Sequence, residues 1–424
     1  MHDFRMVREH ADVLRDGLAR RGRLDALAAT VTRAEGLDRD RRAFIQAVEE
    51  RKATRNALTQ EVARRKRAHE DASDLIERGR LLSDEIGRLE QERAQAEAAL
   101  VALLLELPNL TLPDVPSGGE DANVIVRAWG EPRPRDGVRP HWEVASERGI
   151  IDLERAAKVS GSGFVFYRGA GARLVRALVN FFLDLHTREH GYEEVWAPVL
   201  VNRAAMTGTG QLPKFEDDAY AVRDDDLFLI PTAEVPVTNL YRDEILDGSA
   251  LPRGFAAYTP CFRREAGSAG KDTRGILRTH EFDKVELVRY APAERSEAEL
   301  ELLVGHAEAA LQRLELPYRV KLLAAGDTGF SSAKTYDLEV WAPGVGAWLE
   351  VSSVSTFTDF QARRANIRYR PAPGEKPRFV HTLNGSGLAV PRTIAAILEH
   401  HQRADGSVTV PEALRPHLGA DAIR

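Results

Sequence analysis

Residues 259–286 read TPCFRREAGSAGKDTRGILRTHEFDKVE, and this stretch says most about how the chain folds. An alternating run from Tyr258 to Arg263 predicts a strand, and a second run from Ile276 to Val288 predicts the strand that returns beside it. The loop between the two runs is rich in glycine, and Arg263, Arg264, Glu265, Arg274 and Arg278 lie near it. Because arginine carries a planar, permanently charged fork, such a hairpin suits a phosphate-bearing ligand.

The residues of this basic loop leave one other interpretation open and exclude a second. A basic, glycine-rich hairpin tip is often no more than a solvated turn, and the pattern alone leaves that open. A P-loop is excluded, since position 265 is Glu and Asp272 follows Lys271, where G-x-x-x-x-G-K-[ST] is required. The run 169–171 lacks the third glycine of a dinucleotide fingerprint.

Composition limits the class of protein. The chain has 424 residues, of which 43% are apolar, and its formal net charge is −6. This length predicts two or three domains, and no apolar run reaches the roughly 18 residues of a membrane span. The only cysteine is Cys261, which excludes a disulfide framework and a thiolate zinc site. The N-terminus, Met1–Arg5, lacks an apolar signal core, so we expect a cytoplasmic protein that does not contact a membrane.

Residues 37–107 carry two long helical patterns. In the second pattern an apolar residue recurs every seven positions, at Leu75, Leu82, Leu89, Ala96 and Leu103. The first pattern is weaker, because Arg51 and Arg55 interrupt its seam. A polar break at 69–73 joins the two, and helices joined so tightly must run antiparallel. We therefore predict a coiled-coil arm that extends about 45 Å, at about 1.5 Å per residue.

Charge is divided unevenly along this arm. Residues 39–67 hold 10 Lys/Arg against 4 Asp/Glu, and residues 70–107 hold 4 against 10. Attraction between the two helices explains this pattern equally well without any ligand. However, Arg64-Arg65-Lys66-Arg67 lies beside the turn, where four basic side chains could contact the phosphates of a nucleic acid.

The rest of the chain predicts a connector and an α+β domain. Residues 1–107 are assigned to the helical arm and 141–424 to a catalytic domain. Residues 108–140, with six prolines and four glycines, are assigned to a linker that contains a short strand or two. Helical patterns cover 171–190, 293–314 and 390–403. Strand patterns cover 192–197, 227–230, 256–263, 276–290, 318–324, 335–341, 346–354 and 378–384. Because strands follow one another without helices between them, we expect a mainly antiparallel sheet with flanking helices.

Three segments of this domain resemble the signature motifs of the class II aminoacyl-tRNA synthetases. Residues 171–198 resemble motif 1, 262–282 resemble motif 2, and 385–392 resemble motif 3. Residues 232–234 (TAE), 259–286, 361–364 (QARR) and 381–387 (HTLNGSG) are similar to the bacterial-type seryl-tRNA synthetase family in particular. The N-terminal coiled-coil arm is that family's distinguishing feature, so the resemblance covers essentially the whole chain.

The resemblance implies a two-step ligase reaction. L-serine and ATP would form seryl-adenylate, and serine would then pass to the 3′ end of tRNA-Ser, or of tRNA-Sec. The implied enzyme is a cytoplasmic homodimer that uses Mg²⁺ with ATP and no zinc. The implied catalytic residues are Arg263, Glu350 and Arg392.

The resemblance also implies where each ligand binds. The ATP-binding residues would be Arg263, Arg264, Glu265, Arg278, Thr279, Phe282, Glu350, Val351, Ser352, Ser353 and Arg392, with Glu350 and Ser353 holding Mg²⁺. The serine-binding residues would be Thr232, Ala233, Glu234, Arg263, Glu286, Asn384 and Ser386, the last standing where some relatives carry Thr. The arm would bind tRNA through Arg51, Arg55, Arg64, Arg65, Lys66 and Arg67, and the loop 266–275 would meet the tRNA acceptor end.

Two alternatives remain. Amino acid ligases that load a carrier protein keep the three motifs, but they lack a long arm and usually carry zinc ligands in the pocket. A catalytically inactive relative could serve as a binding module, but Arg263, Glu265, Glu350 and Arg392 are all present.

Overall fold

The computed structural model of the chain describes residues 1–266 and 274–424. These residues form two compact units, Met1–Pro108 and Asn109–Arg424. Among them, no helix combines the length and the apolar character needed to cross a membrane.

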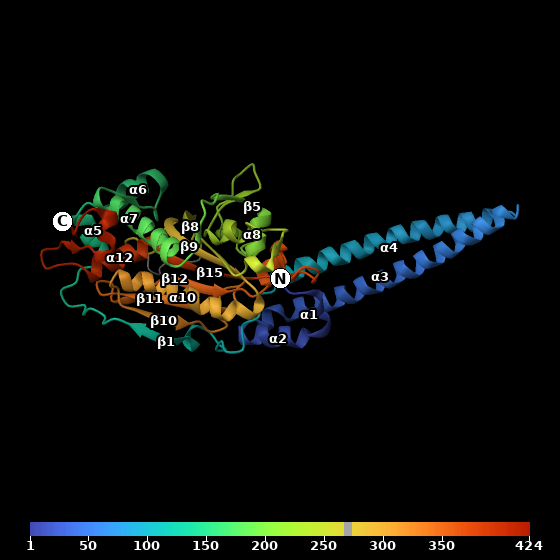
Figure 1. Ribbon diagram of the computed structural model, residues 1–424, viewed down its shortest axis with the longest axis horizontal. Coiled ribbons are helices and arrows are strands. Elements are labelled where there is room, and N and C mark those ends of the chain that lie inside the picture. The colour runs from blue at the N-terminus through green and yellow to red at the C-terminus, as the bar shows by residue number, and fades with distance from the viewer. Residues whose placement is uncertain (267–273) are drawn as a thin grey trace. The chain divides into compact units, whose positions relative to one another are not determined.

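The first unit is a helical arm on a small helical base. Helices α1 (Phe4–Glu9) and α2 (Ala11–Arg20) form the base, and α3 (Leu24–Arg67) and α4 (Ser73–Glu106) form an antiparallel hairpin (Figure 1). The predicted turn is confirmed, and the Asp71 carboxylate accepts the Ser73 N–H at 3.0 Å there. Helix α3 begins well before the predicted start, because residues 24–36 continue its helical pattern into the base.

Ion pairs between α3 and α4 account for much of the arm's charge asymmetry. Arg41, Arg51 and Lys52 of α3 pair with Glu97, Glu85 and Glu90 of α4, at 3.1, 3.0 and 2.6 Å. Pairs as exposed as these contribute little to stability, because water screens their charges. They therefore favour the alignment of two helices that an apolar seam already holds together, with Val48, Ile86, Leu100 and Leu104 buried.

The second unit is built on an eight-stranded sheet, whose order is β1-β10-β11-β12-β15-β9-β8-β4. Its strands are β1 (Val124–Trp129), β10 (Tyr318–Leu322), β11 (Lys334–Ala342), β12 (Ala347–Thr356), β15 (His381–Ala389), β9 (Glu281–Ala291), β8 (Arg253–Phe262) and β4 (Glu193–Glu194). All neighbouring strands are antiparallel except β4 and β8. The predicted α+β class and antiparallel sheet are thus confirmed. The segment 108–140, predicted as a linker that contains a short strand or two, contributes the edge strand β1.

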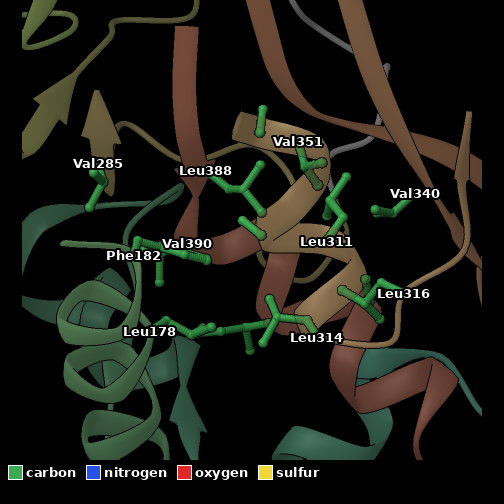
Figure 2. Close-up of a cluster of buried hydrophobic side chains, with 14 of the residues drawn as sticks. Leu178, Phe182, Val285, Leu311, Leu314, Leu316, Val340, Val351, Leu388 and Val390 are labelled. Carbon is green, nitrogen blue, oxygen red and sulfur yellow. The ribbon is translucent and has the colours of Figure 1, made fainter. Parts of the chain in front are cut away.

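One face of the sheet carries the main hydrophobic core. Helices α7 (Ala170–Asp184), α10 (Ser296–Arg313) and α12 (Val390–His400) pack their apolar side chains against it. Figure 2 shows Leu178 and Phe182 of α7 and Leu311 of α10 gathered with Val351 and Leu388 from the sheet. Burying a side chain of this kind contributes about 1.5–3 kcal/mol. This cluster therefore stabilises the sheet and leaves its opposite face available for other side chains.

Shorter elements complete the second unit. They are α5 (His141–Glu147), β2 (Ile151–Asp152), α6 (Leu153–Ser160), β3 (Phe166–Tyr167), β5 (Leu200–Asn202), α8 (Arg203–Thr209), β6 (Leu227–Leu229), α9 (Glu234–Thr238), β7 (Ile245–Asp247), α11 (Phe360–Ala365), β13 (Arg368–Arg370), β14 (Arg378–Phe379), β16 (Val408–Thr409), α13 (Arg415–Leu418) and β17 (Ala422–Ile423).

Several strand boundaries differ from those predicted, and one difference matters for function. The returning strand β9 begins at Glu281, not at Ile276. Ile276 and Leu277 are buried, but as part of an irregular segment. Their apolar character reflects packing of a loop on the core, which alternation alone cannot distinguish from a strand. Of the loop expected to meet the tRNA acceptor end, residues 267–273 lie outside the described residues.

Candidate active site

A cavity of about 550 Å³ opens over the middle of the sheet, on the face opposite the main core. Its walls come from β9, β12, β15, the loop before α9 and the stems of the 259–286 hairpin. Of the predicted site residues, Thr232, Glu234, Arg263, Glu265, Arg278, Thr279, Phe282, Glu286, Glu350, Val351, Ser353, Asn384, Ser386 and Arg392 line it. Side chains from four distant parts of the sequence therefore meet in one place.

Strand alternation explains how β9 contributes to this cavity. Phe282, Lys284 and Glu286 line the cavity, whereas Val285 and Leu287 belong to the core. Successive side chains of a strand point to opposite faces, so every second residue of β9 faces the cavity.

A β-bulge explains the contribution of β12. Ser352 pairs with Leu338 and Glu350 with Glu339, so Val351 is an extra residue without a partner on β11. Glu350 and Ser353 are three positions apart, and a regular strand would turn them to opposite faces. The bulge brings both to the cavity.

Arginines from the hairpin line one part of the cavity. The Arg263 guanidinium lies over the Phe282 ring, 5.1 Å from its centroid, and its Nε donates to Pro231 O at 3.3 Å. Arg278 Nη1 donates to Glu265 Oε2 at 2.7 Å. Because each guanidinium has five N–H donors, both arginines retain donors that could reach an anionic ligand.

Arg392, at the start of α12, is held by the main chain. Its Nη1 donates to Glu350 O at 2.6 Å and its Nε to Leu277 O at 3.2 Å. The Glu350 carboxylate lies 3.7 Å from the same Nη1. These contacts fix one side of the guanidinium and join α12, β12 and the hairpin.

Glu286 occupies a buried polar pocket at another part of the cavity and is only 1% exposed. Thr232 Oγ1 donates to Glu286 Oε2 at 3.2 Å, and Asn384 Nδ2 donates to Oε1 at 3.0 Å. Lys284 Nζ forms an ion pair with Glu286 Oε2 and donates to Thr232 Oγ1 at 2.9 Å. Because the Thr232 oxygen accepts from Lys284, its own hydrogen is free to go to Glu286. The carboxylate is therefore held in one orientation as an acceptor.

Glu234 is a second buried carboxyl group in this pocket. Burial, and then the negative charge of Glu286, raise the pKa of Glu234 to about 7. Gln361 Nε2 donates to Glu234 Oε1 at 2.6 Å, and Gln361 Oε1 accepts from Thr382 at 2.7 Å. A carboxyl group with such a pKa can ionise when a cation arrives near neutral pH.

Oxygen atoms suitable for Mg²⁺ also meet at the cavity. The Glu350 carboxylate and the Ser353 hydroxyl line it together, and Mg²⁺ usually takes only one or two protein oxygens beside phosphate and water. Asp337 pairs with Ser353 across the strands, and burial, followed by the charge of Glu350, raises its pKa well above the usual range. In the described ranges, no group of three or more His, Cys, Asp or Glu side chains is arranged to hold a metal ion. The residues thus fit a cation bound mainly by a phosphate ligand.

Comparisons with known proteins agree with this geometry. The seryl-tRNA synthetase N-terminal domain family matches residues 1–111, and the class II tRNA synthetase core domain family (G, H, P, S and T) matches residues 214–401. The serine–tRNA ligase of Gemmatimonas aurantiaca is 66% identical over 420 residues, 99% of each chain. That of Geobacillus kaustophilus is 56% identical over 427 residues, 100% of each chain.

The chain belongs to the serine–tRNA ligase family. Its structure is also similar to that of the Pyrococcus horikoshii seryl-tRNA synthetase complexed with ATP. The TM-score is 0.95 at 39% identity, over 100% of this chain and 99% of the other.

Three residues that the ligase resemblance placed in the site lie outside the cavity wall. Arg264 donates to Asp217 O at 3.1 Å, so its guanidinium is bound to a neighbouring loop. Ser352 Oγ donates to Ser386 O at 2.7 Å and ties β12 to β15. Ala233 is fully buried. These residues are next to cavity residues in the sequence, but their side chains bond to or pack against other parts of the protein.

Two residues that hold the carboxyl groups of Glu286 and Glu234 were not among the predicted site residues: Lys284, which lines the cavity, and Gln361, which does not. Lys284 lies between Phe282 and Glu286 on one face of β9. Because every second residue of a strand faces the same side, the alternation that turns Phe282 and Glu286 to the cavity also turns Lys284 there. Gln361 is in a segment that resembles the ligase family, but nothing in the sequence indicates its hydrogen bond to Glu234.

The basic residues predicted to bind tRNA lie on the ligase arm in differing environments. Arg51 pairs with Glu85 at 3.0 Å, Arg64 with Glu61 at 2.7 Å, and Arg65 with Asp74 at 3.1 Å. Arg67 Nε donates to Ala63 O at 3.1 Å. Within the described ranges, Arg55 and Lys66 take part in no ion pair.

Proposed function

We propose that the protein activates L-serine with ATP and transfers the seryl group to the 3′ end of tRNA-Ser, with the residues of the cavity in defined roles. The observation that carries this assignment is the cavity itself. It joins a set of arginines, suited to phosphate, to a buried carboxylate pocket, suited to a small amino acid with a hydroxyl group.

In the first step, an oxygen of the serine carboxylate attacks the α-phosphorus of ATP, and the bond to the bridging oxygen breaks as pyrophosphate leaves. Both reactants are anions, so the protein must mainly position them and neutralise charge. Arg263 would contact the α-phosphate and the carboxylate, while Arg278 and Arg392 would reach the outer phosphates. Phe282 would offer its ring to adenine and Glu265 would accept from the adenine amino group.

Glu350 and Ser353 would hold Mg²⁺ against the phosphates. Bound there, the ion would neutralise phosphate charge as pyrophosphate leaves. Val351 would not act as a ligand, but its bulge is what gives these two side chains a common face.

Serine would be selected by the two buried carboxyl groups. Glu286 is held as an acceptor for the substrate hydroxyl, and Glu234 would pair with the substrate ammonium. Alanine would leave Glu286 without the hydroxyl as a partner inside a buried pocket, which strongly disfavours it. Thr232, Asn384 and Ser386 would complete the pocket, and the main chain at Thr279 would face adenine.

In the second step, a ribose hydroxyl at the tRNA 3′ end attacks the seryl carbonyl carbon and AMP leaves. The arm would select the tRNA by its shape and phosphates, through Arg55, Lys66 and Arg67 in particular. We include tRNA-Sec as a second acceptor, a homodimer as the working form and the cytoplasm as the compartment. A carrier protein as acceptor is disfavoured, because the arm has no role in that reaction.

Aminoacylation tests this proposal. Purified protein should attach labelled serine to a tRNA-Ser transcript, and shortening the long variable arm of that transcript should lower charging strongly. The proposal would be contradicted if the full transcript accepted no serine, or if a carrier protein accepted it instead.

A further inference from the structure

Behind the wall of the cavity lies a buried histidine–glutamate pair. His141 opens α5 and Glu399 is near the end of α12, and both side chains are 0% exposed. His141 Nδ1 lies 2.7 Å from Glu399 Oε1. Neither residue lines the cavity, and neither belongs to the three motifs.

Hydrogen bonding determines the state of this pair. Glu399 Oε1 accepts the main-chain N–H of His141 at 2.9 Å. Glu399 Oε2 accepts the main-chain N–H groups of Gly344 and Val345 at 2.8 and 3.0 Å. On the other side of the ring, the main-chain N–H of Ile276 donates to His141 Nε2 at 3.4 Å. A main-chain N–H can only donate, so Nε2 accepts and Nδ1 carries the hydrogen that goes to Glu399. The imidazole therefore connects α12 to Ile276.

Ile276 belongs to residues 274–280, the described return limb of the 259–286 hairpin. Gly275 has a φ of +69°, and a Cβ there would collide with His141 Nε2, so the limb approaches the ring closely. Leu277, which follows Ile276, accepts at its main-chain oxygen a hydrogen bond of 3.2 Å from Nε of Arg392, a residue at the other end of α12. Two adjacent residues of the limb are thus linked to the two ends of one helix, Leu277 directly and Ile276 through His141. Arg278, which follows them, lines the cavity.

We infer that His141, held by Glu399, is a positioning residue for the ATP part of the site. It fixes the return limb so that Arg278 and Thr279 face the nucleotide, although it contacts no substrate. This inference rests on the proposed function, since it assigns ATP to the surface that Arg278 lines.

The variant His141→Asn tests this link selectively. The Asn amide N–H can take the place of Nδ1–H and keep Glu399 paired, but the shorter side chain cannot accept from Ile276. We expect the KM for ATP in serine-dependent ATP–pyrophosphate exchange to rise about 10-fold, because a small misplacement of a positioning group has effects of this size or larger. The KM for serine and the thermal midpoint of unfolding should change little. A role in stability alone would lower the midpoint and leave the KM for ATP unchanged.

A second variant approaches the same contact from the loop. Gly275→Ala would push the limb off the imidazole without touching Glu399, and it should also raise the KM for ATP. His401→Asn is the matched control, since His401 lies just after α12 and bonds Leu314 O at 3.0 Å, away from the limb. An unchanged KM for ATP in both test variants, or equal rises in both KM values, would overturn the inference. Absence of exchange in the unmodified protein would instead refute the proposed function.

Discussion

At the scale of single residues, Lys284 shows what the resemblance left out. The residue is 6% exposed, and its ammonium group donates to Thr232 and pairs with Glu286. A buried carboxylate that loses such a partner is strongly destabilised and is no longer held in place. Lys284 is thus needed to keep Glu286 correctly oriented.

We therefore expect Lys284→Met to raise the KM for serine about 10-fold or more and to leave the KM for ATP within about twofold, since the loss of a close pair is worth at least about 1.4 kcal/mol. Steady-state pyrophosphate exchange measures both values. Lys321→Met is the matched control, because Lys321 pairs with Glu339 at 2.6 Å on the same sheet but outside the cavity wall. Equal effects of the two variants on the KM for serine would contradict this role.

Glu234 predicts a pH dependence. Burial raises its pKa to about 7, so it is largely neutral below that pH and ionised above it. Because only the ionised form attracts the substrate ammonium, kcat/KM for serine should rise as pH increases from 6 to 8 and then level off. The free-enzyme profile measures this, and Glu234→Gln should have lower activity and lack the rise. If kcat/KM for serine rose with pH in the Glu234→Gln variant, with the same midpoint as in the unmodified protein, the ionisation would belong to another group.

At this scale, sequence reasoning identifies residues that line the cavity where a motif fixes both their type and their spacing. Arg263, Phe282, Glu286 and Arg392 were predicted and line the cavity. It does not show which residues a tertiary hydrogen bond holds outside the cavity wall. The bond from Arg264 to Asp217 O joins parts of the chain that are far apart in sequence.

At the scale of elements, local pattern predicted the hairpin but not its detail. The alternation in β8 and β9 follows from their sequence, whereas the start of β9 at Glu281 depends on packing of Ile276 and Leu277. The bulge at Val351 has no sequence signal, yet it gives Glu350 and Ser353 a common face. The ends of strands and their irregularities are set by neighbouring elements rather than by propensity.

The arm offers a test at the same scale. The double variant Lys66→Glu/Arg67→Glu places two negative charges at the tip of α3, and each lost phosphate contact weakens the binding of a nucleic acid. We expect the KM for tRNA-Ser in aminoacylation to rise about 10-fold or more, with serine-dependent pyrophosphate exchange unchanged.

Arg80→Glu provides the control for the tip, since Arg80 is an exposed residue of α4 that pairs with Glu77 at 2.9 Å. If the tip variant charged tRNA-Ser as well as the control, the tip would have no part in tRNA binding.

At the scale of the whole molecule, the main feature is that one face of the sheet carries the hydrophobic core and the other carries the cavity. Val285, Leu287 and Leu338 belong to the core, while Lys284, Glu286 and Asn384 line the cavity. The α+β class and the helical arm follow from periodicity and composition. The order of the strands does not, because it depends on contacts between segments that are far apart in the sequence.

The central claim is that this cavity activates serine. Serine-dependent ATP–pyrophosphate exchange by the full chain, with alanine and threonine as controls, measures it most directly. The geometry of Glu286 predicts rapid exchange with serine, almost none with alanine, and slower exchange with threonine. Exchange that does not depend on serine, or that is equally fast with alanine, would contradict the account.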